Sequence, residues 1–246
     1  MMIDVVAWGG DIGGLSFKAG KQEGKITAKA FTYSEPVKYS GPRIMEIHQS
    51  GDGRVGEDTG PISPEDREHQ SMPLIIEHPG DGATGQASIP PALAKRREKE
   101  PTLVALVALP ANARRTTVLL APAAAGTYQG YVIDDDPSRL PLGKLRVHNL
   151  SPLTIAMQFT GGHKKEMKPR DTLLVDAPKG QAVYQLAYRT ADSWKVQENN
   201  IIPVRPDEQT QFIVLKSNNQ FFLSADGAAG GYLQTVILRR QTRSTP

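Results

Sequence analysis

Two ten-residue stretches of this chain are nearly the same, and this internal repeat constrains the fold more than any other feature. Residues 124–133 (AAGTYQGYVI) align with residues 228–237 (AAGGYLQTVI), and six of the ten positions are identical at an offset of 104. Other apolar positions match in the same order: Ile3 with Leu145, Val5 with Val147, Phe17 with Phe159, Pro110 with Pro203 and Thr117 with Thr210. A repeat of this length predicts two tandem copies of one domain.

Each copy reads as a series of short strands. Residues 145–150 and 153–159 alternate apolar and polar side chains, as half-buried strands do, and Ser151-Pro152 separates them. Further strands are expected at residues 172–175, 182–189, 194–196, 210–216, 220–224 and 232–238, and in the first copy at 103–109 and 116–120. Turn signals at this spacing are typical of antiparallel sandwiches. We therefore predict an all-β fold of two tandem immunoglobulin-like β-sandwiches, although the motifs resemble no named family.

The repeat also sets the expected boundaries. The first β-sandwich spans residues 1–137, the second spans 143–241, and 242–246 form a tail. The proline-containing stretch between the copies predicts a short, rather stiff connection. The first copy carries an insertion at about residues 49–101, with short helices expected near residue 63 and at 91–100. Its apolar residues 74–76 are expected to hold it against one edge of the first domain.

Composition excludes several classes of protein. Glycine and proline together make up 42 of 246 residues, which favours short elements joined by turns over long helices. The absence of cysteine excludes disulfides, a thiol nucleophile and Cys-ligated zinc. No apolar stretch approaches the length of a membrane-spanning helix. The first 142 residues carry a net charge of −3 and the rest +6, but the basic residues are spread out, so no nucleic-acid binding is predicted.

The sequence predicts no catalytic, cofactor or metal site. A glycine-rich stretch at residues 9–14 precedes a further strand, not the helix that a dinucleotide loop requires. The consecutive acids Asp134 to Asp136 could contribute to a calcium site, but a solvated linker is the favoured interpretation. Histidines and acids around the insertion could assemble a metal site, yet they lack a metal-binding motif: His48, His69, His78, Glu46, Asp52, Glu57 and Asp58. His148 and His163 are expected at the surface.

The favoured function is that of a non-catalytic interaction or structural protein, secreted or associated with the cell envelope. No leader is visible in the chain, so a cytoplasmic location is the alternative. A carbohydrate-binding protein is the second hypothesis, with Trp8, Tyr39 and Trp194 as aromatic platforms for a sugar ring. The third is a hydrolase whose site is formed by the insertion. The expected partner is accordingly a protein or a polysaccharide, and the sequence predicts no oligomeric state.

Overall fold

The fold is described from a computed structural model, in which residues 1–20, 22–50, 89–136, 140–161, 164–177, 180–216 and 233–241 are placed. Almost all of the regular structure in these ranges is β-strand, so the predicted all-β class is confirmed. The strands of the first half are β1 (Met2–Ala7), β2 (Ile12–Ala19), β3 (Gln22–Ala30), β4 (Val37–Lys38), β5 (Ile44–Gln49), β6 (Leu103–Ala108), β7 (Arg115–Pro122) and β8 (Tyr128–Asp134). The expected helix near residue 63 and the apolar residues 74–76 lie outside the described residues.

The first half is a single curled sheet rather than two packed sheets. Its strands follow the order β6-β5-β2-β3-β1-β7-β8, with β4 paired to β1. The ends of this order meet, because β6 packs on β8 and Gly130 of β8 lies against Val107 of β6, where a Cβ atom would come within 2.8 Å of the valine side chain. One core receives side chains from strands all around the sheet, including Ile3, Phe17 and Met45. The sheet is therefore nearly a closed barrel, and the expected sandwich is not seen here.

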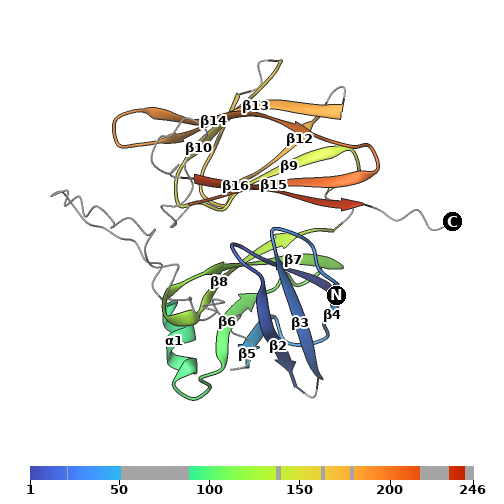
Figure 1. The fold of residues 1–246 in the computed structure, drawn as a ribbon, viewed down its shortest axis with the longest axis vertical. Helices are drawn as coiled ribbons and strands as arrows, with labels where there is room; N and C mark the ends of the chain where they lie inside the picture. The colour runs from blue at the N-terminus through green and yellow to red at the C-terminus, as the bar shows by residue number, and fades with distance from the viewer. Residues whose placement is uncertain are drawn as a thin grey trace, which may run out of the picture.

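The only α-helix among the described residues is α1 (Pro91–Arg97), which falls where a short helix was expected within the insertion. Pro91 stands at its first position, where a missing N–H does no harm. Leu93 is its buried residue, and the helix lies against β6 (Figure 1). The helix therefore covers part of the outer surface of the barrel.

The second half consists of two four-stranded sheets. Their orders are β12-β9-β15-β16 and β11-β10-β13-β14. The strands are β9 (Lys144–Asn149), β10 (Ile155–Phe159), β11 (Lys164–Met167), β12 (Thr172–Asp176), β13 (Gln181–Arg189), β14 (Trp194–Pro203), β15 (Glu208–Lys216) and β16 (Leu233–Gln241). A core that includes Met157, Leu186 and Phe212 lies between the sheets. Seven strands expected from the sequence are confirmed, because 145–150, 153–159, 172–175, 182–189, 194–196, 210–216 and 232–238 correspond to β9, β10, β12, β13, β14, β15 and β16. The strand expected at 220–224 lies outside the described residues.

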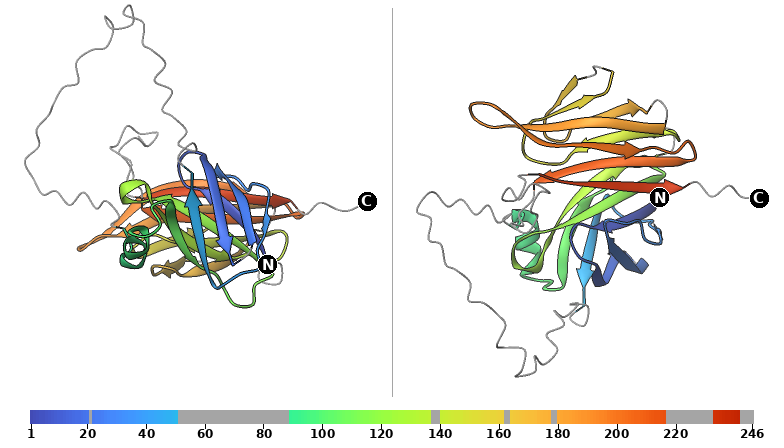
Figure 2. Two further views of the ribbon diagram at one scale, coloured as in Figure 1. Left: turned by 90° about the horizontal axis from the view of Figure 1, so that it is seen from below. Right: turned by 45° about the horizontal axis from the view of Figure 1, so that its top comes forward.

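The two halves pack on each other through equivalent strands. In the first half β7 lies parallel to β1 and antiparallel to β8, and in the second half β15 lies parallel to β9 and antiparallel to β16. Figures 1 and 2 show the β15–β16 layer lying over the green β7–β8 strands. A separate apolar cluster joins these layers: Val6, Trp8, Leu119, Ile133, Ile213, Leu215 and Leu238. We call the region where the β1-β7-β8 strands and the β9-β15-β16 strands pack on each other the junction.

Strands at the junction are buried on both faces. In β1, Ile3 and Val5 enter the barrel core, whereas Asp4 and Val6 face the second half. All but the last residue of β15 are buried. Successive side chains of a strand point to opposite faces. In β1 and β15 one face points into a core, so the polar side chains on the other face meet a sheet of the other half instead of water. Two basic residues of the second half, Arg146 and Arg240, have their side chains in the junction instead of in solvent.

Candidate functional site

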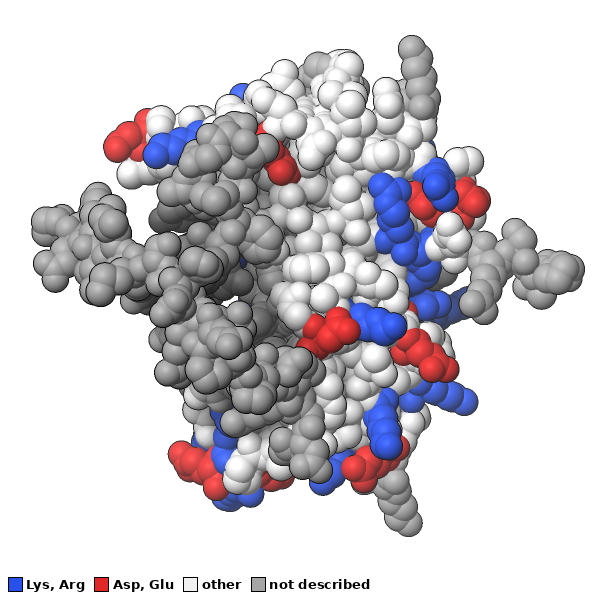
Figure 3. Space-filling view, viewed as in Figure 1, with Lys and Arg blue, Asp and Glu red and all other residues white. Residues whose placement is uncertain are grey.

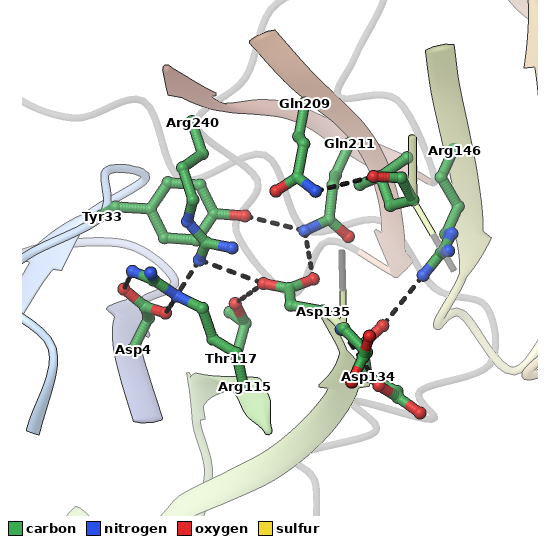
Figure 4. Close-up of polar contacts among 12 residues, drawn as sticks. Asp4, Tyr33, Arg115, Thr117, Asp134, Asp135, Arg146, Gln209, Gln211 and Arg240 are labelled. Atoms are coloured by element: carbon green, nitrogen blue, oxygen red, sulfur yellow. Dashed lines mark hydrogen bonds and ion pairs between the residues drawn. The ribbon is translucent and has the colours of Figure 1, made fainter. Parts of the chain in front are cut away.

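A polar network crosses the junction beside its apolar cluster (Figure 4). The carboxylate of Asp4 on β1 accepts two hydrogen bonds from Arg115 on β7, at 2.7 and 2.9 Å, and one from Arg240 on β16 at 2.8 Å. Arg240 also donates to Asp135 Oδ2 at 3.1 Å and lies 4.1 Å above the ring of Tyr33. Two arginines thus face two buried carboxylates, and a buried group of this kind requires such a balance of charge.

Gln211 of β15 links this ion-pair group to β9. Its amide nitrogen donates to Asp135 Oδ1 at 2.6 Å and to the Tyr33 hydroxyl at 2.7 Å. Its carbonyl oxygen lies 2.8 Å from His148 Nε2, so the imidazole donates from that nitrogen. Only one orientation of the Gln211 side-chain amide satisfies all three contacts, with its nitrogen toward Asp135 and Tyr33 and its oxygen toward His148.

Burial shifts the acid–base properties of this network. It raises the pKa of Asp135, against the opposing effect of Arg240, and it raises the pKa of Tyr33 far above its ordinary value. It lowers the pKa of His148 from its ordinary 6.5 to about 4; Arg146 acts in the same direction and the Gln211 contact acts against it. His148 is 3% exposed, so the expectation of a surface histidine is wrong. The imidazole is neutral at neutral pH.

Stability should therefore fall in acid. An unfolded His148 binds its proton near pH 6.5 and the folded one only near pH 4, so the free energy of unfolding falls as pH drops through this window. By about pH 4.5 the loss from this residue amounts to about 2–3 kcal/mol.

Denaturant unfolding of the wild type and of His148→Gln, which keeps a donor toward Gln211, measures this loss of stability. Asp135, with a raised pKa, contributes in the opposite sense in both proteins, so the difference between them isolates His148. Equal acid sensitivity of the two would contradict the assignment.

The three consecutive aspartates take part in the junction instead of a solvated linker. Asp135 is fully buried, and Thr117 also donates a short hydrogen bond to its carboxylate. The backbone oxygen of Asp134 accepts from Arg146, and its carboxylate accepts from the backbone N–H of Asp136. Of the glycine-rich residues 9–14, Gly9 and Gly10 lie between β1 and β2, and residues 12–14 belong to β2 itself, a further strand as predicted.

The three aromatic residues proposed as sugar platforms lie in different environments. Trp8 is 7% exposed, packs edge-on against Phe31 and donates from its indole nitrogen to Gln234 at 2.8 Å. Tyr39 is 3% exposed and its hydroxyl donates to the Pro42 carbonyl at 2.8 Å. Trp194, at the start of β14, is 40% exposed. Of the three, Trp194 alone offers a ring face that a ligand could cover.

Trp194 belongs to a larger exposed apolar surface on β13 and β14. Val183, Val196 and Ile201 are 36%, 57% and 50% exposed. Val183 pairs with Ile201, Ala187 with Val196 and Arg189 with Trp194. Directly paired residues point to the same side of a sheet, and residues 183, 187 and 189 of β13 share one side by their even spacing. We call the set Val183, Trp194, Val196 and Ile201 the hairpin face.

A shallow hollow of about 460 Å³ lies at the end of the hairpin face away from Trp194. Its lining includes an apolar pair, Val183 and Ile201, and four residues with amide side chains: Gln158, Gln185, Asn199 and Asn200. A second hollow of about 620 Å³ opens where β10 and β11 approach β12 and is lined in part by Lys164 and Lys165. The first hollow is therefore lined by both apolar and neutral polar residues.

The histidines and acids around the insertion are brought together in part. Glu46 and His48 of β5 lie with Glu100, which follows α1, and one ligand atom from each falls within 4.8 Å of the others. Glu100 was missed in the sequence. His69, His78, Asp52, Glu57 and Asp58 lie outside the described residues, as does His163.

A search against protein families finds no match to this chain, and a search of curated proteins finds no similar sequence. Within the placed part of the chain, no helix is long and apolar enough to cross a membrane.

Proposed function

We propose that this chain is a non-catalytic interaction protein that binds a partner protein through the hairpin face of its second half. The observation that carries the proposal is the concentration of exposed apolar side chains. Among the described residues, seven large hydrophobic side chains are exposed, and four of them are the hairpin face. Soluble proteins seldom leave such groups together in water unless another surface covers them, and tryptophan is enriched where binding energy is concentrated.

The position of the hairpin also favours docking. It projects beyond the neighbouring strands in Figure 1 and in the right-hand view of Figure 2. Figure 3 shows that most charged side chains on this side of the molecule lie toward its margins, and the four side chains of the hairpin face are themselves uncharged. An uncharged surface loses little hydration free energy when a partner covers it, because no ion must be desolvated.

Side chains rather than backbone groups are the expected means of contact. β14 is the last strand of its sheet, so its outer edge could in principle accept another strand. However, the N–H of Ile201 already donates to the side-chain oxygen of Asn200 at 2.8 Å, and Pro203 has no N–H. These features block continuous strand pairing, as edge-protecting residues do elsewhere. The partner is thus expected to bring an apolar patch, not a free strand.

The buried titratable groups favour a structural role for the junction. Asp135 and His148 have shifted pKa values, which in a cleft would suggest catalysis. Here both are enclosed between the sheets and bonded to Arg240 or Gln211. Their chemistry is used to hold the two halves in one orientation, which would present the hairpin face on a rigid body.

The proposal retains the duplicated organisation, with residues 1–137 and 143–241 as related copies. The shared β1-β7-β8 and β9-β15-β16 arrangements support it, together with their packing on each other as in a two-fold dimer. The immunoglobulin-like description stays a proposal for the second half, on the basis of its two packed sheets. A secreted or cell-envelope location also stays a prediction.

Carbohydrate binding is the second candidate, and one observation favours it. The amides of Gln158, Gln185 and Asn199 surround the hollow beside Ile201, and such groups both donate to and accept from sugar hydroxyls. Trp194 lies about six residues along the hairpin from this hollow, roughly 20 Å away. A single sugar ring could not contact both, so this candidate requires an oligosaccharide.

The test uses a displayed peptide library selected on the full-length protein. Selected peptides should bind Trp194→Ala and Ile201→Ser at least about tenfold more weakly, because truncating a central apolar contact typically removes about 2 kcal/mol of binding energy. The matched control is Ile44→Ser, which removes an equally exposed apolar side chain from the first half and should leave binding unchanged. Peptides that bind all three variants equally would overturn the proposal. Binding of oligosaccharides on a glycan array, lost in Trp194→Ala or in Gln185→Ala, would replace it with the second candidate.

A further inference from the structure

We propose that Glu46, His48 and Glu100 bind a divalent transition-metal ion, with zinc as the preferred ion. One imidazole nitrogen and two carboxylate oxygens form a ligand set that zinc accepts. The three ligand atoms lie within 4.8 Å of one another. Ligands bound to one zinc ion are about 3–3.5 Å apart, given zinc–ligand bonds of about 2 Å. Small rotations of the two glutamate side chains would therefore bring them into contact with a shared ion.

The burial and hydrogen bonding of His48 provide independent support for a metal ion at this site. Its side chain is 5% exposed, and its Nδ1 lies 3.2 Å from Thr102 Oγ1. Its Nε2 is buried and has no hydrogen-bond partner among the placed residues, and it lies 3.8 Å from Glu100 Oε2. A buried polar atom without a partner destabilises the folded protein, because it has lost its hydration and gained no hydrogen bond. A metal ion bound at Nε2 would remove this penalty.

The contact with Thr102 suits a ligand histidine. A proton on Nδ1, donated to the threonine hydroxyl, leaves the lone pair of Nε2 free and pointed at the glutamates. Histidine ligands of metals usually have their second nitrogen held in this way, which fixes the tautomer and the ring. Thr102 is thus a positioning residue for the proposed site.

The fold brings the three residues together from two segments distant in sequence. Glu46 and His48 are two positions apart on β5, so both face outward, whereas Met45 and Ile47 enter the barrel core. The pairing of β5 with β6 shifts between Ile47 and His48, but the extra residue is Val104 of β6, so the alternation along β5 that places Glu46 and His48 on one side is kept.

The second segment is the turn between α1 and β6. The N–H of Leu103 donates to the oxygen of Glu100 at 3.0 Å, and the N–H of Gln49 donates to the oxygen of Thr102 at 2.8 Å. These backbone bonds hold the turn beside the end of β5. The site is therefore built on hydrogen-bonded backbone at both of its edges.

Arg96 of α1 is the group that competes with the ion. Its guanidinium forms a short ion pair with Glu46, but the arginine side chain is 51% exposed and can turn toward solvent. A carboxylate has two oxygens, so Glu46 could bind the ion through one and keep Arg96 on the other.

Three protein ligands leave at least one position on the zinc ion for water. The imidazole disfavours calcium and magnesium, which prefer sets made entirely of oxygen ligands.

The test measures zinc binding to the full chain after treatment with a chelator. Isothermal titration with zinc chloride should give one ion per chain, and X-ray absorption should show one imidazole among nitrogen and oxygen ligands. Zinc in large excess over its dissociation constant should raise the midpoint of thermal unfolding by about 5 °C or more. The proposal is independent of the hairpin face, so Trp194→Ala should bind zinc normally.

Matched variants decide the outcome. Glu100→Gln removes an exposed ligand without disturbing the core and should weaken zinc binding by about tenfold or more. Glu98→Gln removes the same charge from a nearby exposed position and should bind as the wild type does. His48→Gln should abolish the imidazole signature in the absorption spectrum. Zinc binding of wild-type strength in Glu100→Gln, a preference for calcium or magnesium, or no binding at all would overturn the proposal.

Discussion

Replacing Arg240 by methionine is expected to lower the free energy of unfolding by about 3–5 kcal/mol at neutral pH. Arg240 is the cation paired with Asp135, whose side chain is fully buried. Asp4 keeps Arg115 after the substitution, but Asp135 keeps only the neutral contacts from Thr117 and Gln211. An uncompensated carboxylate between two sheets destabilises the folded state far more than a lost surface pair does.

The effect of leaving the Asp135 carboxylate without a counterion can be separated from the effect of losing the packing of the Arg240 side chain. Protonation removes the charge from Asp135, so the deficit of Arg240→Met should shrink as the pH falls. Adding Asp135→Asn to Arg240→Met should recover part of the lost stability, because the amide needs no counterion. The control is Arg189→Met, whose arginine pairs with Glu166 at 3.8 Å on the surface and should matter by less than about 1 kcal/mol. Denaturant unfolding of the four proteins would contradict this account if Arg240→Met and Arg189→Met were equally stable.

The sequence predicts the strands well because alternation is a local property. β9, β10, β12 and β13 fall where the apolar and polar residues alternate. The barrel-like curl of the first half is not local. It depends on the parallel pairs of β1 with β3 and β7, which join segments far apart along the chain, and on the contact of Gly130 with Val107. No spacing in the sequence specifies those pairings.

Alternation also fails to identify what faces the polar side of a strand. Asp4, His148 and Gln211 occupy the polar positions that would face water in an isolated sandwich. Their partners come in part from the other half: Asp4 is bonded to Arg240 on β16, and Gln211, which holds His148, is bonded to Asp135 of the first half. A pattern of period two gives the same sequence in both cases. The contacts among carboxylate, arginine and amide side chains at the junction therefore cannot be predicted without knowing how the two halves pack on each other.

The candidate metal site was partly accessible from the sequence. Glu46 and His48 are two residues apart, and on any strand this spacing places two side chains on one face, as it does on β5. Glu100 could not be added, because its approach depends on how the turn after α1 is bonded to β5. The aromatic candidates were ambiguous for a similar reason. Trp8 and Trp194 are chemically alike, and only their burial separates a residue of the junction from one of the hairpin face.

That contrast gives the second large effect. Trp8→Ala should lower the free energy of unfolding by about 3–5 kcal/mol, since it removes a buried aromatic side chain from the junction. It also leaves the side-chain oxygen of Gln234 without its donor and Phe31 without its edge-on neighbour. Trp194→Ala removes the same side chain from an exposed position and should change stability by less than about 1 kcal/mol.

The two tryptophan variants should therefore behave in opposite ways. At a temperature where both are folded, Trp8→Ala should bind the selected peptides normally, whereas Trp194→Ala should bind them weakly while unfolding like the wild type. Thermal unfolding together with a binding isotherm measures both quantities on the same samples. A stable Trp8→Ala would mean that the junction does not hold the two halves together as its contacts indicate. A destabilised Trp194→Ala would mean that the hairpin face supports the fold and is not free to receive a partner.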